Sequence, residues 1–180
     1  MNTVEPIRDR KLIVKIENIL ARKGSRDLLL FVLGTNSGLR ISDMLALNIG
    51  DARNKSHIEI EEIKTKKKKK FPINNKLKRL IQSFTLGKDN SEPLFVSQKS
   101  NHLSRGQAYK IIHDACREAG IAYNIGTHNL RKSFGYHHYK QYKDVAILQA
   151  ILNHSSPSIT LKYIGINQDI IDESYNNFEL

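Results

Sequence analysis

The chain has 180 residues, which is enough for one domain with its own hydrophobic core. Its 29 lysines and arginines outnumber the 18 acidic residues, so the net charge is +11. The sequence holds one cysteine, no run of about 18 apolar residues and no apolar stretch typical of a secretory signal. These features exclude an internal disulfide, disfavour a membrane span and predict a cytoplasmic protein. The positive charge attracts polyanions, with nucleic acid as the first expected partner and an anionic membrane surface as the second.

Hydrophobic periodicity and turn residues predict the elements of the first half of the chain. In chain order these are a helix over 8–23, a buried helix over 27–36 that ends near Ser37-Gly38, a short helix over 39–47, a strand over 57–63, a second strand over 71–73 and a helix over 74–85. The lysine run Lys66–Lys70 lies between the two strands, which predicts a β-hairpin with a basic tip.

Capping residues mark the elements of the second half. The expected elements are a small strand over 94–97, a helix from the Ser104–Gln107 capping box to Ala119, a helix from the cap Thr127 to about Gln141, an apolar helix over 145–152 capped by Asp144, a helix that begins at Ser156-Pro157, and a weakly helical segment over 167–178. Residues 86–93 form the most linker-like segment. The predicted fold class is therefore mainly α with a small antiparallel β-sheet (α+β).

Cleavage of a DNA phosphodiester without a metal sets clear chemical requirements. The transition state gathers negative charge on the non-bridging oxygens, so fixed cations must point at them. A nucleophile must attack phosphorus, and an acid must protonate the departing 5′ oxygen. Arginine suits the first task because its planar fork holds two oxygens and stays charged. Slow reactions of this kind need roughly 10–20 kcal/mol of barrier lowering, so several groups must cooperate.

The sequence contains a set of residues that fits these requirements. The segments that carry it are, in order, Gly38-Leu-Arg40-Ile-Ser-Asp43, Thr127-His128-Asn-Leu-Arg131, Leu152-Asn153-His154-Ser-Ser-Pro157 and Thr160-Leu-Lys-Tyr163-Ile164. His128 and Arg131 lie three residues apart and share a face of the predicted helix. Tyr163 follows His154 by nine residues.

At these residues the sequence resembles the tyrosine recombinase (phage integrase) family. In that family an arginine in a G-L-R-x-S-[ED] segment is followed by a lysine on a β-hairpin, an H-x-L-R motif, an L-G-H-S-S-like motif and a nucleophilic tyrosine about nine residues on. All five elements occur here in that order, between Gly38 and Tyr163. Each element alone is a weak signal, but the ordered set is highly specific. The resemblance covers nearly the whole chain and implies the tyrosine recombinase catalytic-domain fold.

The resemblance assigns a role to most of these side chains. Arg40 and Arg131 would hold the scissile phosphate, and Tyr163 would attack it. His128 would accept a proton or donate a hydrogen bond at the tyrosine and phosphate. His154 would complete the phosphate site by hydrogen bonding. Because the phosphotyrosyl bond conserves the energy of the broken linkage, no cofactor and no metal is required.

The hairpin lysine and two neighbouring motif positions need separate treatment. Lys64 precedes the expected turn and would protonate the 5′ oxygen, with Lys66 as the alternative. The register stays open because Lys66 and Lys67 occupy positions where the family often has glycine. Asn153 stands where the family usually has glycine before the histidine, and we expect this change to be tolerated. Asp43 would orient the site without a direct part in the chemistry.

The implied function is that of a site-specific DNA recombinase that works through a 3′-phosphotyrosine intermediate in DNA integration, excision or inversion. The implied partner is double-stranded DNA, bound by a homo-tetramer that is weakly associated or monomeric when free, with no membrane partner. Residues 1–180 would form the catalytic domain without the family's N-terminal core-binding domain, as a natural single-domain protein or as part of a longer one. The segment 164–180 would dock on a neighbouring protomer.

Several alternatives stay open at this point. A type IB topoisomerase shares the chemistry, although the short motif 152–157 resembles recombinases more. A non-catalytic DNA-binding regulator would keep the fold without the reaction, and a basic RNA-binding protein would have no need of Tyr163. Tyr175 is the rival nucleophile, but it lacks a histidine nine residues before it. The pair His137-His138 suggests a metal site as a further alternative, but no cysteine or carboxylate lies at a spacing that supports one.

Overall fold

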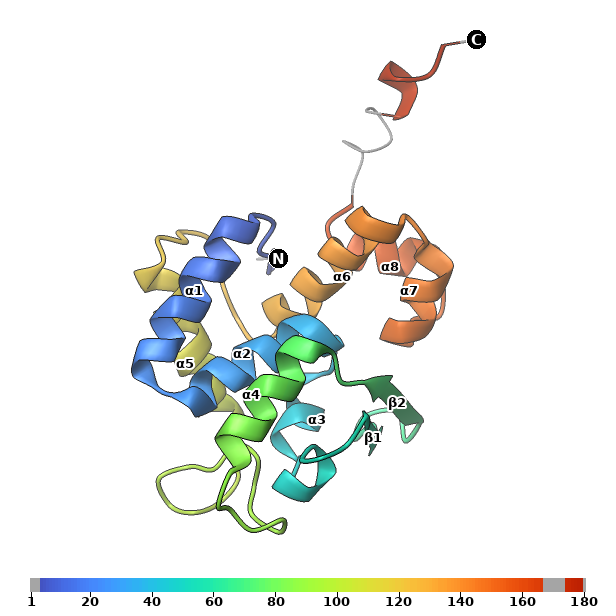
Figure 1. The fold of residues 1–180 in the computed structure, drawn as a ribbon. Helices are drawn as coiled ribbons and strands as arrows, with labels where there is room; N and C mark the ends of the chain where they lie inside the picture. Colours follow the sequence, from blue (N-terminus) through green and yellow to red (C-terminus); the bar gives the residue numbers. More distant parts are fainter. Residues whose placement is uncertain (1–3, 167–173, 180) are drawn as a thin grey trace.

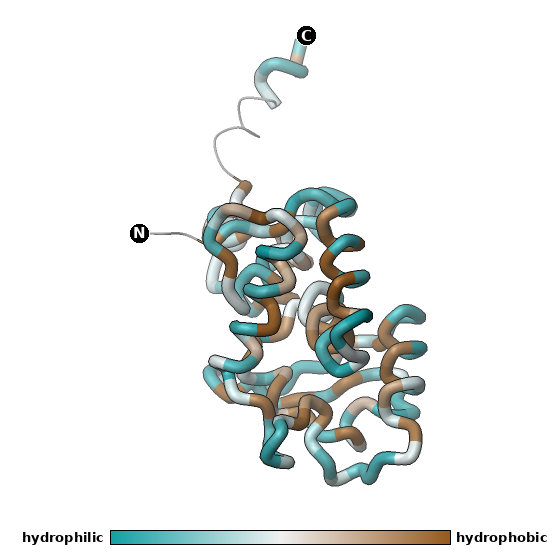
Figure 2. The backbone as a smooth tube through the Cα atoms, turned by 90° about the vertical axis from the view of Figure 1, so that its left-hand side faces the viewer, coloured by the Kyte–Doolittle hydropathy of each residue, from teal (hydrophilic) through white to brown (hydrophobic). Residues whose placement is uncertain are grey.

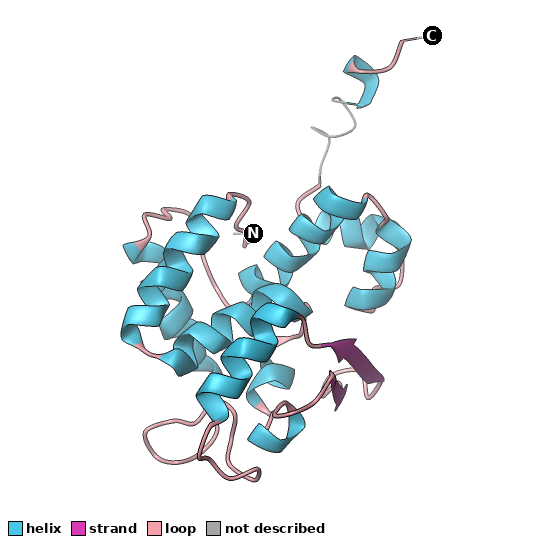
Figure 3. Cartoon of the chain, in the orientation of Figure 1, coloured by secondary structure: helices cyan, strands magenta, loops and turns pink. Residues whose placement is uncertain are grey.

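The computed structural model describes residues 4–166 and 174–179 and has the predicted fold class, helical with one small sheet (Figures 1 and 3). The elements are α1 (Arg10–Lys23), α2 (Ser25–Ser37), α3 (Ile41–Leu45), the 3-10 helix η1 (Ile49–Asp51), β1 (His57–Glu61), β2 (Lys68–Pro72), α4 (Asn75–Thr85), α5 (Arg105–Glu118), α6 (His128–Tyr142), α7 (Val145–Leu152) and α8 (Pro157–Tyr163). Among the described residues, every helix is too short or too polar to span a bilayer.

Helix α2 lies at the centre of the fold and packs against α1, α4 and α6 (Figure 1). Its residues 29–33 are completely buried, which agrees with a sequence that is apolar on every side of this helix. The surrounding helices have only one buried face, so apolar and polar residues alternate along their tubes in Figure 2. Burial of α2 on all sides makes its carboxyl end a rigid support for the segment that follows.

Helices α6, α7 and α8 form a second small cluster at one side of the molecule (Figure 1). Its buried residues are Leu148, Leu152, Ile164 and Ile166. Helix α6 joins this cluster to the main core, because a Cβ on Gly34 of α2 would lie 2.6 Å from Leu130 of α6. The close approach of α2 and α6 brings residues near 38 and residues near 131 together.

The β-hairpin is antiparallel, with His57 opposite Pro72 and Glu61 opposite Lys68. Ile58 and Phe71 are buried on its inner face. Side chains alternate between the two faces of a strand, so Lys69 shares this inner face with Phe71. Residues 62–67 form the turn, which holds Lys66 and Lys67 of the predicted basic tip, while Lys68–Lys70 belong to β2.

The predicted caps are largely confirmed. Ser104 and Gln107 form a reciprocal capping box, and the side chains of Asp144 and Ser156 accept hydrogen bonds from backbone N–H groups of α7 and α8. Thr127 precedes α6 as expected, but its side chain makes no capping bond because its backbone is already helical.

The strand predicted over 94–97 is wrong. Leu94 and Phe95 are buried in a turn, and only the isolated bridges Asn48–Pro93 and Val96–His102 form near them. The helix expected over 167–178 falls largely outside the described residues, as do Ile170 and Ile171. The described residues 174–176 form one helical turn that lies apart from the body (Figure 1).

Candidate active site

Arg131 lies on the first turns of α6 and is only 3% exposed. One end of its guanidinium donates to the carbonyl oxygen of Gly38 at 2.5 Å, and the other donates to the carbonyl oxygen of Leu152. These oxygens lie at the carboxyl ends of α2 and α7, where helices leave carbonyls without partners. Arg131 therefore joins the two motif segments that surround residues 40 and 154.

Arg40 directly precedes α3, and its charge acts on both Arg131 and Tyr163. Its side chain is 18% exposed and lies 2.7 Å from the carboxylate of Glu62, without the alignment of a hydrogen bond. Burial lowers the pKa of Arg131, and the charge of Arg40 lowers it further. The two arginines thus lie close enough for one charge to act on the other, although they are 91 positions apart in the sequence.

Tyr163, at the end of α8, lies close to both arginines. Its hydroxyl is buried and has no hydrogen-bond partner in the described part of the chain. Burial raises the pKa of Tyr163, and the charges of Arg131 and Arg40 oppose this effect. The ring packs edge-on against His154 at 5.0 Å between centroids, and the Lys132 ammonium lies 5.2 Å from its centroid.

The two motif histidines come from different elements, and the charges of Arg131 and Arg40 act on both. His128 is the first residue of α6, and His154 follows α7 with its Nδ1 3.1 Å from the hydroxyl of Thr160. Burial and the charge of Arg131 lower the pKa of both histidines. Both are therefore neutral at pH 7, a state in which one ring nitrogen can accept a proton.

Lys64 lies in the exposed turn of the hairpin. Its charge is among those that lower the pKa of His128, after burial and the charges of Arg131, Lys132 and Arg40, so the turn faces the start of α6. The preceding backbone N–H, of Ile63, donates to the carboxylate of Asp43 at 3.0 Å. Lys66 adopts φ 58°, a left-handed conformation that suits glycine. Through its bond to Ile63, Asp43, which was expected to orient the site, contacts the turn directly.

Sequence reasoning missed Glu62, which is 1% exposed and lies beside Arg40. Burial opposes its ionisation, but hydrogen bonds from Thr65 and Asn153 and the close ion pair with Arg40 outweigh burial and lower its pKa to about 2. The signal was present, since positions 58, 60 and 62 alternate onto the buried face of the hairpin. An acidic residue in that register needs a cationic partner.

Lys69 is the second residue that sequence reasoning missed, because a lysine run such as Lys67–Lys70 is most often solvated surface and was expected to be so here. Its ammonium donates to the carbonyl oxygen of Ile151 at 3.0 Å, at the end of α7. Burial and the charge of Arg131 lower its pKa to about 8. The position shares the inner face of the hairpin with Phe71, and the charges of Arg131 and Arg40 both act on it.

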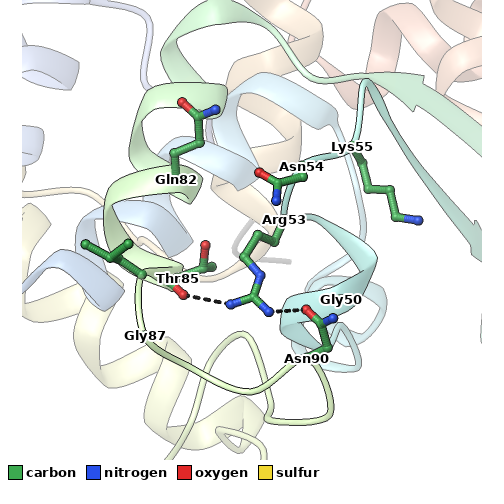
Figure 4. A pocket seen from close by; sticks show the side chains of 9 residues that line it. Gly50, Arg53, Asn54, Lys55, Gln82, Thr85, Gly87 and Asn90 are labelled. Carbon is green, nitrogen blue, oxygen red and sulfur yellow. Dashed lines mark hydrogen bonds between the residues drawn. The ribbon is translucent and has the colours of Figure 1, made fainter.

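A hollow of about 740 Å³ lies elsewhere, between η1 and the end of α4 (Figure 4). None of the motif residues lines it. Arg53 crosses it, donating to the carbonyl oxygens of Thr85 and Lys88 and to the side chain of Asn90. These acceptors occupy the guanidinium, so Arg53 stabilises the loop and the hollow is not the candidate active site.

Comparison with known proteins decides the family. A model described as the phage integrase family matches residues 9–169. The chain belongs to this family. Membership confirms the predicted fold class and the predicted class of enzyme, a site-specific DNA recombinase of the tyrosine recombinase type.

Curated members of the phage integrase family include relatives of similar length. The probable integrase/recombinase YoeC of Bacillus subtilis (strain 168) is 47% identical over 179 residues, covering 99% of this chain and 98% of that protein. The type 1 fimbriae regulatory protein FimE of Escherichia coli (strain K12) is 31% identical, covering 80% of this chain and 76% of FimE. The tyrosine recombinase XerC of Thermodesulfovibrio yellowstonii is 26% identical, and this integrase-family chain spans 54% of it.

Solved structures of the same family share the fold. XerA recombinase has a TM-score of 0.81 at 20% identity, over 100% of this chain and 66% of XerA. A lambda integrase tetramer bound to a Holliday junction has a TM-score of 0.73 at 18% identity, over 91% of this chain and 49% of that integrase.

Proposed function

We propose that this recombinase cuts double-stranded DNA by attack of Tyr163 on the scissile phosphate, which forms a 3′-phosphotyrosine and releases a 5′ hydroxyl. One observation carries the proposal. The Tyr163 hydroxyl is buried close to the guanidinium groups of Arg131 and Arg40, and it makes no hydrogen bond of good geometry among the described residues. A buried hydroxyl is costly to leave unpaired, which supports a role in binding an absent group.

The proposed step balances as an in-line substitution. The bond between the Tyr163 oxygen and phosphorus forms while the bond from phosphorus to the 5′ oxygen breaks. Arg40 and Arg131 neutralise the charge that develops on the non-bridging oxygens. Their positions support this role, since the charges of both guanidinium groups act on the Tyr163 hydroxyl.

Proton transfers accompany both ends of this substitution. His128 accepts the phenol proton, a role supported by the neutral state that burial and Arg131 impose on it at pH 7. Lys64 gives its proton to the departing 5′ oxygen. His154, packed against the ring of Tyr163, donates a hydrogen bond to the phosphate. In rejoining, a 5′ hydroxyl attacks the phosphotyrosine and the same groups act in reverse.

The partner proposal follows from charge and from the relatives. A net charge of +11 favours binding to the DNA backbone with a steep dependence on salt. Because lambda integrase is known as a tetramer on a Holliday junction, we propose a tetramer on DNA for this chain and a monomer or weak assembly when free. The segment 164–180 would then dock on a neighbouring protomer, and its described residue Phe178 is 68% exposed. We also propose that the chain acts in the cytoplasm and that residues 1–180 form its catalytic domain.

A covalent-capture experiment tests the proposal. The protein is incubated with nicked duplexes of randomised sequence, in which strand loss after cleavage traps the intermediate, and adducts are resolved by denaturing electrophoresis and sequenced. We expect adducts with the wild-type chain and with the control Tyr175→Phe, and none with Tyr163→Phe. Adducts that persist in Tyr163→Phe, or their absence with the wild-type chain, would contradict the proposal.

A further inference from the structure

Asn153 occupies the position directly after α7 and directly before His154. Its backbone is left-handed, with φ 53° and ψ 47°, a conformation that asparagine tolerates better than most residues. The backbone N–H of Asn153 bonds to Ala150 and Gln149 and completes the end of α7. The side chain is therefore not needed to cap its own helix.

The side chain of Asn153 instead bonds to the hairpin turn, residues 62–67. Its amide nitrogen donates to the carboxylate of Glu62 at 3.1 Å and to the hydroxyl of Thr65 at 3.4 Å. Its amide oxygen accepts from the ammonium of Lys67 at 3.0 Å. One side chain thus holds three points of a turn that lies 86 to 91 positions away in the sequence.

These bonds enclose the position of Lys64. Glu62 and Thr65 flank it on either side, and the hydroxyl of Thr65 also donates to Glu62 at 2.5 Å. The Lys64 side chain is exposed, so few neighbouring side chains hold it in place. Its direction therefore depends mainly on the conformation of the turn backbone. A general acid has to lie within hydrogen-bond reach of the leaving oxygen, and small misplacements are costly to the rate.

We infer that Asn153 is a positioning residue that holds the hairpin turn against the end of α7, and so directs Lys64 toward the 5′ oxygen of the scissile bond. This inference rests on the proposed function. The same residue precedes His154, so Asn153 fixes the proton donor relative to the phosphate site. Glycine at this position would keep the left-handed backbone but would make none of the three contacts with the turn.

The test compares two leaving groups in the Asn153→Gly variant. Both substrates are nicked duplexes with a sequence identified by the covalent-capture experiment. One has the normal 5′ oxygen at the scissile bond, and the other has a bridging 5′ sulfur there. Breaking the bond from phosphorus to sulfur releases a thiolate, which needs no proton because the pKa of thiols, roughly 8.5, is far below that of alcohols. The sulfur substrate therefore removes the need for a correctly placed acid and for nothing else.

We expect Asn153→Gly to cleave the oxygen substrate at least about 10-fold more slowly than the wild-type chain, and the sulfur substrate at nearly the wild-type rate. Lys64→Ala should show the same pattern with a larger loss. Asn153→Asp, which keeps the size but loses the amide donors beside Glu62, should also be slowed on oxygen and restored by sulfur. Asn54→Gly is the matched control, since Asn54 has φ 59° and no side-chain hydrogen bond among the described residues.

The outcomes separate the inference from the function on which it rests. Unchanged cleavage of the oxygen substrate by Asn153→Gly overturns the inference alone. Equal slowing on both substrates does so too, because it would indicate a loss of folding or DNA binding. If the wild-type chain forms no adduct with either substrate, the proposed function fails and takes the inference with it.

Discussion

The guanidinium of Arg131 donates to the carbonyl oxygen of Gly38, two residues before Arg40, at 2.5 Å. Gly38 ends α2 with φ 61°, and a Cβ on it would lie 2.6 Å from the ring of Phe134. Position 38 must therefore offer a left-handed backbone, leave room for an aromatic ring and present its carbonyl to Arg131. Glycine meets all three demands, which explains why it precedes the arginine in this motif.

Replacing this glycine should be destabilising beyond backbone strain. Gly38→Ala adds a left-handed alanine, at about 1–2 kcal/mol, and overpacking against Phe134, at about 1–3 kcal/mol. We expect the free energy of unfolding in urea to fall by about 2–5 kcal/mol. Gly87→Ala is the control, because Gly87 has φ 73° with nothing within 4 Å of the added Cβ. Equal losses in the two variants would rule out the contact with Phe134 as a cause.

The Tyr163→Phe variant should separate catalysis from stability. The hydroxyl of Tyr163 is buried and unpartnered among the described residues, so its removal leaves no hydrogen bond broken and relieves a desolvation cost. We expect the covalent adduct to disappear while the free energy of unfolding stays within about 1 kcal/mol of the wild-type value or rises. A larger loss in thermal or urea denaturation would show that the hydroxyl supports the fold.

The pH dependence of cleavage should report His128. Burial, followed by Arg131, lowers the pKa of His128 below its usual value of 6.5. The histidine then accepts a proton throughout the neutral range, and we expect single-turnover cleavage to stay level from pH 8 to about 6.5 and to fall below that. In His128→Gln the phenol must ionise unaided, so the slower rate should rise with pH toward the raised pKa of Tyr163. A wild-type profile that declines above pH 7 would contradict this assignment.

Acid stability should depend on Glu62. Its pKa is about 2 in the folded chain against an ordinary value of 4.5, so its contribution to stability is complete above pH 4.5 and is lost as the pH falls toward 2. A shift of this size corresponds to about 3 kcal/mol. We expect the difference in free energy of unfolding between the wild-type chain and Glu62→Gln to shrink over that range. Glu59→Gln, at the exposed pair with Lys70, should show no comparable change.

Short-range signals account for most of what could be predicted without a structure. The caps at Ser104, Asp144 and Ser156 each bond to backbone within three residues, so the sequence around them contains the whole interaction. The expected strand over 94–97 failed because a strand needs a partner that its own residues do not specify. The roles of Glu62 and Lys69 were missed for the same reason, because their partners lie far away in the sequence.

By itself, the sequence determined the family, the helical fold class and the six candidate catalytic residues, because ordered motifs and local periodicity need no knowledge of packing. Only the tertiary structure decided that Glu62 lies beside Arg40, that Lys69 reaches the end of α7, and that Asn153 holds the turn around Lys64. These contacts join positions up to 91 residues apart. They depend on where the helices and the hairpin pack, and that packing is set by the whole core rather than by any short segment.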